Sequence, residues 1–129
     1  MKRFATLFAV CMATVGLCML STGEVAARPE YKARLEEACK NSKGIDAIKE
    51  AKCNTCHYGK SKKNRNDFGQ AINKHINEET YKSLKSDKEN LLKKVDEALK
   101  AALKEKSKDG KTFGELIQSG SLPAVNPEE

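Results

Sequence analysis

The sequence predicts a small all-α protein built as a single domain. In several segments apolar residues recur at intervals of three and four, which is the spacing of one face of a helix. No segment alternates apolar and polar residues as a half-buried strand does, and no internal repeat is present. The chain has 129 residues, a length that suits one domain with a modest core.

The first 27 residues have the pattern of an export signal. Residues 1–3 are positively charged, a mostly apolar run follows over 4–20, and small residues end the segment at Ala27. An uncleaved membrane anchor is the alternative, since the apolar run approaches the length that spans a bilayer. We therefore expect a signal peptide, residues 1–27, and an exported domain, residues 28–129, with no membrane attachment after cleavage.

The helices that we expect at the start of this domain are short. The first follows an extended lead-in at residues 28–29, and a polar break over 41–44 separates it from a second helix that leads into Cys53. The apolar stripe of the first helix consists of Tyr31, Leu35, Ala38 and Cys39.

Capping signals mark the starts of three later helices. Asn66 or Asp67 can cap the first of these, and Ser86 to Glu89 and Thr112 to Glu115 have the pattern of capping boxes. The tail over 121–129 is expected to be extended and partly loose. The apolar positions of these helices are, in order, Phe68, Ala71, Ile72 and Ile76; Leu92, Val95, Leu99 and Leu103; and Phe113, Leu116 and Ile117.

The stretch Cys53-Asn54-Thr55-Cys56-His57 has the C-x-x-C-H pattern that attaches a c-type haem. Two thiols three positions apart can each add across one vinyl group of the same porphyrin. The histidine that follows can bind the iron through an imidazole nitrogen. The export signal supports this interpretation, because such haem is attached outside the cytosol. We expect one covalent haem c on Cys53 and Cys56, with His57 as the proximal iron ligand.

Two other interpretations of this stretch are weaker. A zinc site would need four ligands, which Cys39, Cys53, Cys56 and His75 could supply, but the adjacent Cys56 and His57 fit poorly on one small tetrahedron. A thioredoxin-type redox pair would need a βαβ pattern around it, and the sequence has none.

The ligand on the other side of the iron is an open question. Every methionine lies within the first 19 residues, so a His/Met haem is excluded once the signal is removed. Cys39 is an odd thiol in an exported chain and could bind as thiolate, although a lone cysteine on an apolar face is usually a small core residue. His75 could bind as imidazole, or the position could be open.

Charge restricts the partners that the chain could have. The 24 Lys and Arg residues outnumber the 18 Asp and Glu residues, and a basic loop over 59–67 follows the C-x-x-C-H stretch directly. This loop could dock an acidic redox partner or neutralise haem propionates, or it could be solvated without a specific role. No nucleic-acid-binding motif accompanies the lysines, so a nucleic-acid partner is not expected.

The run CNTCHYGKSKKNRN, with Phe68-Gly69 and the FGELI…GSLP segment over 113–123, resembles the small monohaem cytochromes c of planctomycete and anammox bacteria. Within that family the chain is similar to the paired small anammox subunits, which form a heterodimer with a His/Cys-ligated haem in each and bind nitric oxide and carbon monoxide. The resemblance implies a cytochrome c-like helical fold, His57 as the proximal ligand and Cys39 as the distal one. It also implies a dimer, which could be a heterodimer with a related small cytochrome, located in the periplasm or the lumen of the anammox organelle.

Two functions follow from these residues. One is a haem protein that binds nitric oxide or carbon monoxide when Cys39 leaves the reduced iron, in sensing, transport or scavenging. The other is a low-potential electron carrier without gas binding, with His75 as the ligand if Cys39 is not. An enzyme is not expected, because the domain lacks a convincing distal Arg/His pair for acid–base chemistry.

Overall fold

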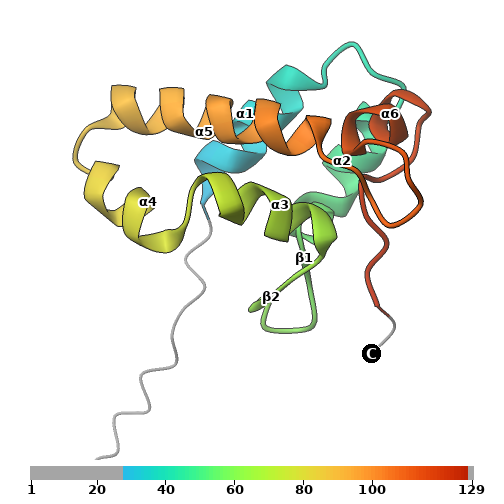
Figure 1. Cartoon of the computed structure of the whole chain (residues 1–129), viewed down its shortest axis with the longest axis horizontal. Coiled ribbons are helices and arrows are strands. Elements are labelled where there is room, and N and C mark those ends of the chain that lie inside the picture. Colours follow the sequence, from blue (N-terminus) through green and yellow to red (C-terminus); the bar gives the residue numbers. More distant parts are fainter. Residues whose placement is uncertain (1–27, 128–129) are drawn as a thin grey trace, which may run out of the picture.

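The computed structural model describes residues 28–127, and the predicted signal peptide lies outside this range. Within it, no helix is both long and apolar enough to cross a bilayer. Figure 1 shows a layer of helices with a small hairpin projecting from one side. The elements are α1 (Pro29–Ala38), α2 (Ile45–Ala51), the 3-10 helix η1 (Lys52–Thr55), β1 (His57–Tyr58), β2 (Asn64–Arg65), α3 (Asp67–His75), α4 (Glu78–Leu84), α5 (Lys88–Lys104) and α6 (Phe113–Gln118).

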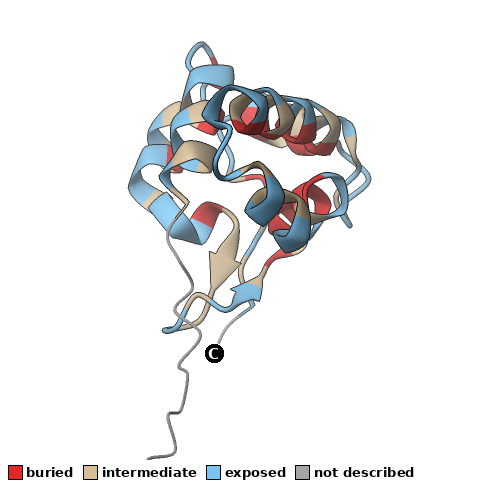
Figure 2. Ribbon diagram, turned by 90° about the vertical axis from the view of Figure 1, so that its left-hand side faces the viewer, coloured by how far each residue is buried: buried red, intermediate tan, exposed pale blue. Residues whose placement is uncertain are grey.

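The longest helix, α5, organises the core. It packs against α1, α3, α4 and α6, and Figure 2 shows its buried positions turned toward the other helices. Aromatic packing extends the core from α3 to α6, because the ring centroids of Phe68 and Phe113 are 5.2 Å apart. Helix α1 adds Leu35 and Cys39 to the same cluster. The buried positions of α5 are Leu91, Val95, Ala98, Leu99 and Ala102.

The structure confirms a predominantly helical fold and most of the expected helices. Helix α3 begins where its cap was predicted, and its four predicted apolar positions are all buried. The capping box that starts α6 is present, with Thr112 and Glu115 bonded to each other's backbone N–H groups.

Several details were predicted wrongly. The lead-in is not extended, since Pro29 already lies in the first turn of α1. Asp87, not Ser86, caps α5 by accepting from the Asn90 amide, so the predicted box is absent there. The register of α5 buries Leu91 instead of Leu92, which is only half-buried.

The basic loop that was expected over 59–67 is a turn over 59–63 followed by a short strand, β2. Strands β1 and β2 pair antiparallel, with His57 opposite Arg65 and Tyr58 opposite Asn64. Each strand has only two residues, too few to produce a visible alternation in the sequence. The hairpin is solvated or half-buried along its length, and it projects from the helices in Figure 2.

An ion pair between Arg34 and Asp96 joins α1 to α5. The Arg34 side chain donates from Nε to Asp96 Oδ1 at 2.6 Å, and its second nitrogen pairs with the other carboxylate oxygen. A two-bonded arginine–carboxylate pair fixes geometry better than a single contact. The Arg34 hydrogen bond holds the pKa of the Asp96 carboxyl below its ordinary value.

The first turn of α3 approaches the backbone of the C-x-x-C-H stretch very closely. A Cβ atom added to Gly69 would lie 2.2 Å from the Cys56 carbonyl oxygen. No larger residue fits there without moving the two segments apart, so this glycine is required by contact and not by its own backbone angles.

We therefore expect Gly69→Ala to lower the free energy of unfolding by about 2 kcal/mol, since it overpacks the contact. Chemical denaturation of the two proteins would measure the difference. Gln70→Ala, at the exposed neighbouring position, should change stability by no more than about 0.5 kcal/mol. Equal stabilities for Gly69→Ala and wild type would contradict the close approach.

The Asp96 pair predicts a pH dependence. Because the pKa of Asp96 is lower in the folded chain than in the unfolded one, its stabilising effect is complete above the unfolded pKa of about 3.9. The effect is lost as pH falls through the folded pKa. Wild type should therefore lose more stability than Asp96→Asn when thermal unfolding is followed from about pH 6 to about pH 2. Asp109→Asn, in the exposed turn after α5, should behave as wild type does.

Candidate haem site

A change of backbone direction at Lys52 presents the C-x-x-C-H stretch. Lys52 has φ 51° and ψ −120°, a conformation that costs a non-glycine residue of order 1–3 kcal/mol. Helix α2 ends there, and the chain continues through η1 into β1. The stretch therefore leaves the helical layer at the base of the projecting hairpin, as Figure 1 shows.

The two thiols of the stretch differ in exposure. Both are free, and Cys53 is exposed, whereas Cys56 is half-buried and packs against the core. Burial, with a smaller contribution from Cys53, raises the pKa of the Cys56 thiol to about 12. The two thiols that would attach a porphyrin therefore differ in environment, because one is open to solvent and the other is partly covered by the core.

The imidazole of His57 has the protonation state of an iron ligand. Its Nδ1 lies 3.1 Å from the carbonyl oxygen of Asn64, across the hairpin. Because a carbonyl can only accept, Nδ1 carries the proton, and the lone pair is left on Nε2. Burial lowers the pKa of His57, and the positive charges of Arg65 and Arg28 lower it further, so the neutral ring is favoured. Such a backbone bond is how proteins commonly orient a metal-binding histidine.

Asn66 connects the C-x-x-C-H stretch to α3. Its side-chain oxygen accepts from the Gly69 amide at 3.0 Å and so caps the helix. Its Nδ2 donates to the Thr55 carbonyl at 3.1 Å, and its backbone N–H donates to the Cys56 carbonyl at 3.0 Å. The side chain is 3% exposed, so these bonds are made out of water. The capping role was predicted from the sequence, but the bonds to the C-x-x-C-H stretch were not.

A corner of aromatic and cationic side chains lies near His57. The Arg28 guanidinium carbon is 4.1 Å from the ring centroid of Tyr81, and the rings of Tyr31 and Tyr81 are 5.9 Å apart. Arg65 belongs to the same corner, because it lies opposite His57 in the hairpin and its charge acts on Tyr31. No local pattern predicts this grouping, since its members come from β2, from α4 and from α1 with its N-cap.

Within this group of side chains, the Tyr31 hydroxyl is the group beside which a haem propionate would fit. Its oxygen is buried, and none of the described residues accepts a hydrogen bond from it, since Arg28 beside it can only donate. Burial raises the pKa of Tyr31, and Arg28 and Arg65 oppose that rise. A carboxylate here would give the hydroxyl an acceptor and would meet two positive charges. Haem carries two such propionate groups, so the residues present fit that cofactor.

Cys39 is a core residue in the structure. It is 5% exposed, it ends α1, and burial raises the pKa of its thiol. In Figure 1 this end of α1 lies on the opposite side of the helical layer from the hairpin that His57 begins. The predicted pairing of Cys39 with His57 across an iron would therefore require the end of α1 to shift, and it stays a prediction.

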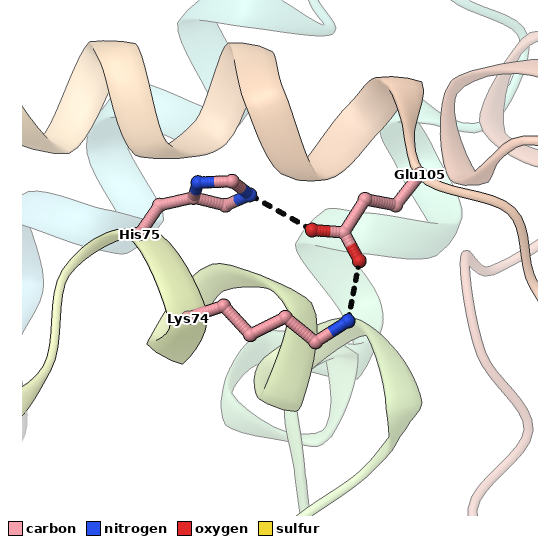
Figure 3. Close-up of polar contacts among 3 residues, drawn as sticks. All are labelled: Lys74, His75 and Glu105. Atoms are coloured by element: carbon pink, nitrogen blue, oxygen red, sulfur yellow. Dashed lines mark hydrogen bonds and ion pairs between the residues drawn. The ribbon is translucent and has the colours of Figure 1, made fainter.

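His75 is engaged elsewhere. Its Nε2 lies 2.8 Å from Glu105 Oε1, and Lys74 donates to the other oxygen of that carboxylate at 2.7 Å, as drawn in Figure 3. The three side chains join the end of α3 to the residue that follows α5. Lys74 is the main cause of the lowered pKa of Glu105. As a distal ligand, His75 would have to leave this cluster.

The described residues do not support the zinc interpretation. Among residues 28–127, no three His, Cys, Asp or Glu side chains gather closely enough to hold a metal ion. Cys39, Cys53, Cys56 and His75 are therefore not a four-ligand site in this structure. A haem iron takes only two protein ligands, so this finding leaves the haem interpretation as it was.

The outer face of the hairpin is basic. An open hollow of about 490 Å³ lies between the hairpin and α3, with Tyr58 and Gln70 in its wall. Its charged residues are Lys63, Arg65 and Lys74, and its wall contains no acidic residue. This surface lies on the same hairpin as His57, where a negatively charged partner could approach.

Comparison of the chain with models of known protein families, with curated proteins and with solved structures finds no match.

Proposed function

We propose that the chain is an exported c-type cytochrome with one covalent haem. The observation that carries this proposal is the C-x-x-C-H stretch together with the His57 imidazole, whose Nδ1 bond to the Asn64 carbonyl puts the lone pair for an iron on Nε2. The free thiols of Cys53 and Cys56 would form the two thioethers. The cytochrome c-like character of the fold belongs to this proposal as well.

Each residue of the site then has a distinct task. Cys53 and Cys56 hold the porphyrin, and His57 binds the iron from the hairpin side. Arg28, Arg65 and the Tyr31 hydroxyl bind the propionates, because they supply positive charge and a buried donor without a partner. When bound, haem supplies one-electron chemistry and a sixth coordination position on the iron.

The proposed use of that sixth position is reversible binding of nitric oxide or carbon monoxide. Cys39, as thiolate, would occupy it while the iron is ferric. If a redox partner protein reduced the haem, Cys39 would take up a proton from solvent and withdraw, and the position would then be open to the gas. The resemblance to the paired anammox subunits supports this function, and a dimer with a related small cytochrome would accompany it. The compartment would be the periplasm or an internal organelle.

Electron transfer at low potential is the second candidate function. The basic hollow beside the hairpin favours it, because Lys63 and Arg65 offer an acidic redox protein a docking surface on the hairpin that carries His57. The engagement of Cys39 in the core also suits this function, since electron transfer requires no displaceable ligand. In this case either Cys39 or His75 would complete the coordination.

Covalent attachment is the first prediction. In cells that mature c-type cytochromes, the wild-type polypeptide should keep a haem stain after denaturing electrophoresis, because thioether bonds survive denaturation. Replacing both Cys53 and Cys56 by Ala should abolish the stain. Cys39→Ala, which leaves the C-x-x-C-H stretch intact, should keep it. A colourless wild-type protein produced under these conditions would contradict the proposed haem.

Electron paramagnetic resonance of the ferric protein distinguishes the two candidate distal ligands, Cys39 and His75. If Cys39 binds, wild type should give a low-spin thiolate signal that Cys39→Ala loses and His75→Ala keeps. The reverse pattern would assign the position to His75.

Under nitric oxide or carbon monoxide, reduced wild type should change its visible spectrum. If it does not, gas binding is wrong and electron transfer remains.

A further inference from the structure

The C-terminal tail, which was expected to be partly loose, is held against the core. Pro123 is among the most deeply buried side chains, and Ala124 packs against the core. Val125, by contrast, is 90% exposed. The chain thus turns outward and then back, and Asn126 reaches the C-x-x-C-H stretch. Figure 1 shows the tail descending beside the segment that contains β1.

Asn126 bonds with both of its polar side-chain atoms. Its Nδ2 donates to the Asn54 carbonyl at 3.1 Å, and its Oδ1 accepts from Asn66 Nδ2 at 2.8 Å. Asn66 Nδ2 in turn donates to the Thr55 carbonyl, and the Asn66 N–H donates to the Cys56 carbonyl. Two asparagines that lie 60 positions apart in the sequence therefore hold three successive carbonyls of the C-x-x-C-H stretch.

These carbonyls need such partners for a physical reason. A short 3-10 helix leaves the last carbonyls of its turn without partners within the helix, and η1 ends at Thr55. Asn54 and its neighbours would otherwise be free to rotate, and the side chains of the two cysteines and His57 would rotate with them. The asparagine bonds remove that freedom where the attachment geometry is set.

We propose that Asn126 and Asn66 are positioning residues, and that the tail is a strap that fixes the C-x-x-C-H stretch in the geometry that aims His57 at the iron. This inference rests on the proposed haem function and deepens it. Neither asparagine touches the iron; both act through the backbone that carries its ligand and the two thioether positions.

The chain offers a matched control. Asn66 and Asn77 are both helix caps with nearly the same backbone angles, and each accepts from the amide three residues on. Only Asn66 also contacts the C-x-x-C-H stretch. Asn66→Ala therefore removes a cap and the strap bonds, Asn77→Ala removes a cap alone, and Asn126→Ala removes strap bonds alone.

The test measures two properties of the full exported protein. Amide hydrogen exchange over residues 54–57 should become at least tenfold faster in Asn126→Ala and Asn66→Ala than in wild type, and change less than twofold in Asn77→Ala. In the same proteins with haem attached, the fraction of high-spin ferric haem should rise at least threefold in the two strap variants only. Asn126 lies on the tail surface, so its variant remains informative if Asn66→Ala does not fold.

The outcomes separate the strap from the haem function. Unchanged exchange and spin state in Asn126→Ala, with haem attached, would overturn the strap and leave the haem function standing. If wild type never acquires haem but exchange over residues 54–57 is still faster in the two strap variants, the strap contacts are supported and the role in aiming His57 is overturned. A spin-state change in Asn77→Ala as large as in Asn126→Ala would also overturn the inference, because loss of any cap would then suffice.

Discussion

The contact between the first turn of α3 and the Cys56 carbonyl is the constraint on which the candidate site depends. Gly69 permits an approach that any side chain would block, and Asn66 supplies the hydrogen bonds that make the approach favourable. Because Phe68 holds α3 in the core against α5 and α6, the position of the C-x-x-C-H stretch is set by the packing of the core. The hairpin then continues from that point and carries His57.

The same constraint explains why the hairpin is so short. The chain must leave η1, present His57 and return to cap α3 at Asn66, and two residues per strand are enough for this. The turn uses two residues with positive φ, Gly59 and Lys62. The bond from His57 to the Asn64 carbonyl adds a side-chain link across the two strands. The histidine is therefore part of what stabilises the element that presents it.

Sequence reasoning predicted those features that local chemistry controls. The faces of α3 and α6 and the caps at Asn66 and Thr112 follow from spacing and side-chain type, and the structure has them. The start of α5 was misjudged because Ser86 and Asp87 are both good caps and only tertiary packing chooses between them. The Arg28–Tyr81 stacking and the Asn126 bonds join residues 53 or more positions apart, and no local pattern marks them. The C-x-x-C-H stretch was recognisable because its chemistry needs three residues within five positions, whereas a distal ligand is fixed only by the fold.

If the chain is exported as proposed, signal cleavage would change the charge of the aromatic and cationic corner. Arg28, which stacks on Tyr81, is the residue immediately after the expected signal cleavage. A cut at that bond would create a free α-amino group on the same residue and so add a second positive charge to the corner facing Tyr31. The full positive charge of the candidate site would then be present only after the peptidase had acted. A cut one residue later, after Arg28, would remove the guanidinium and alter the site without any mutation in it.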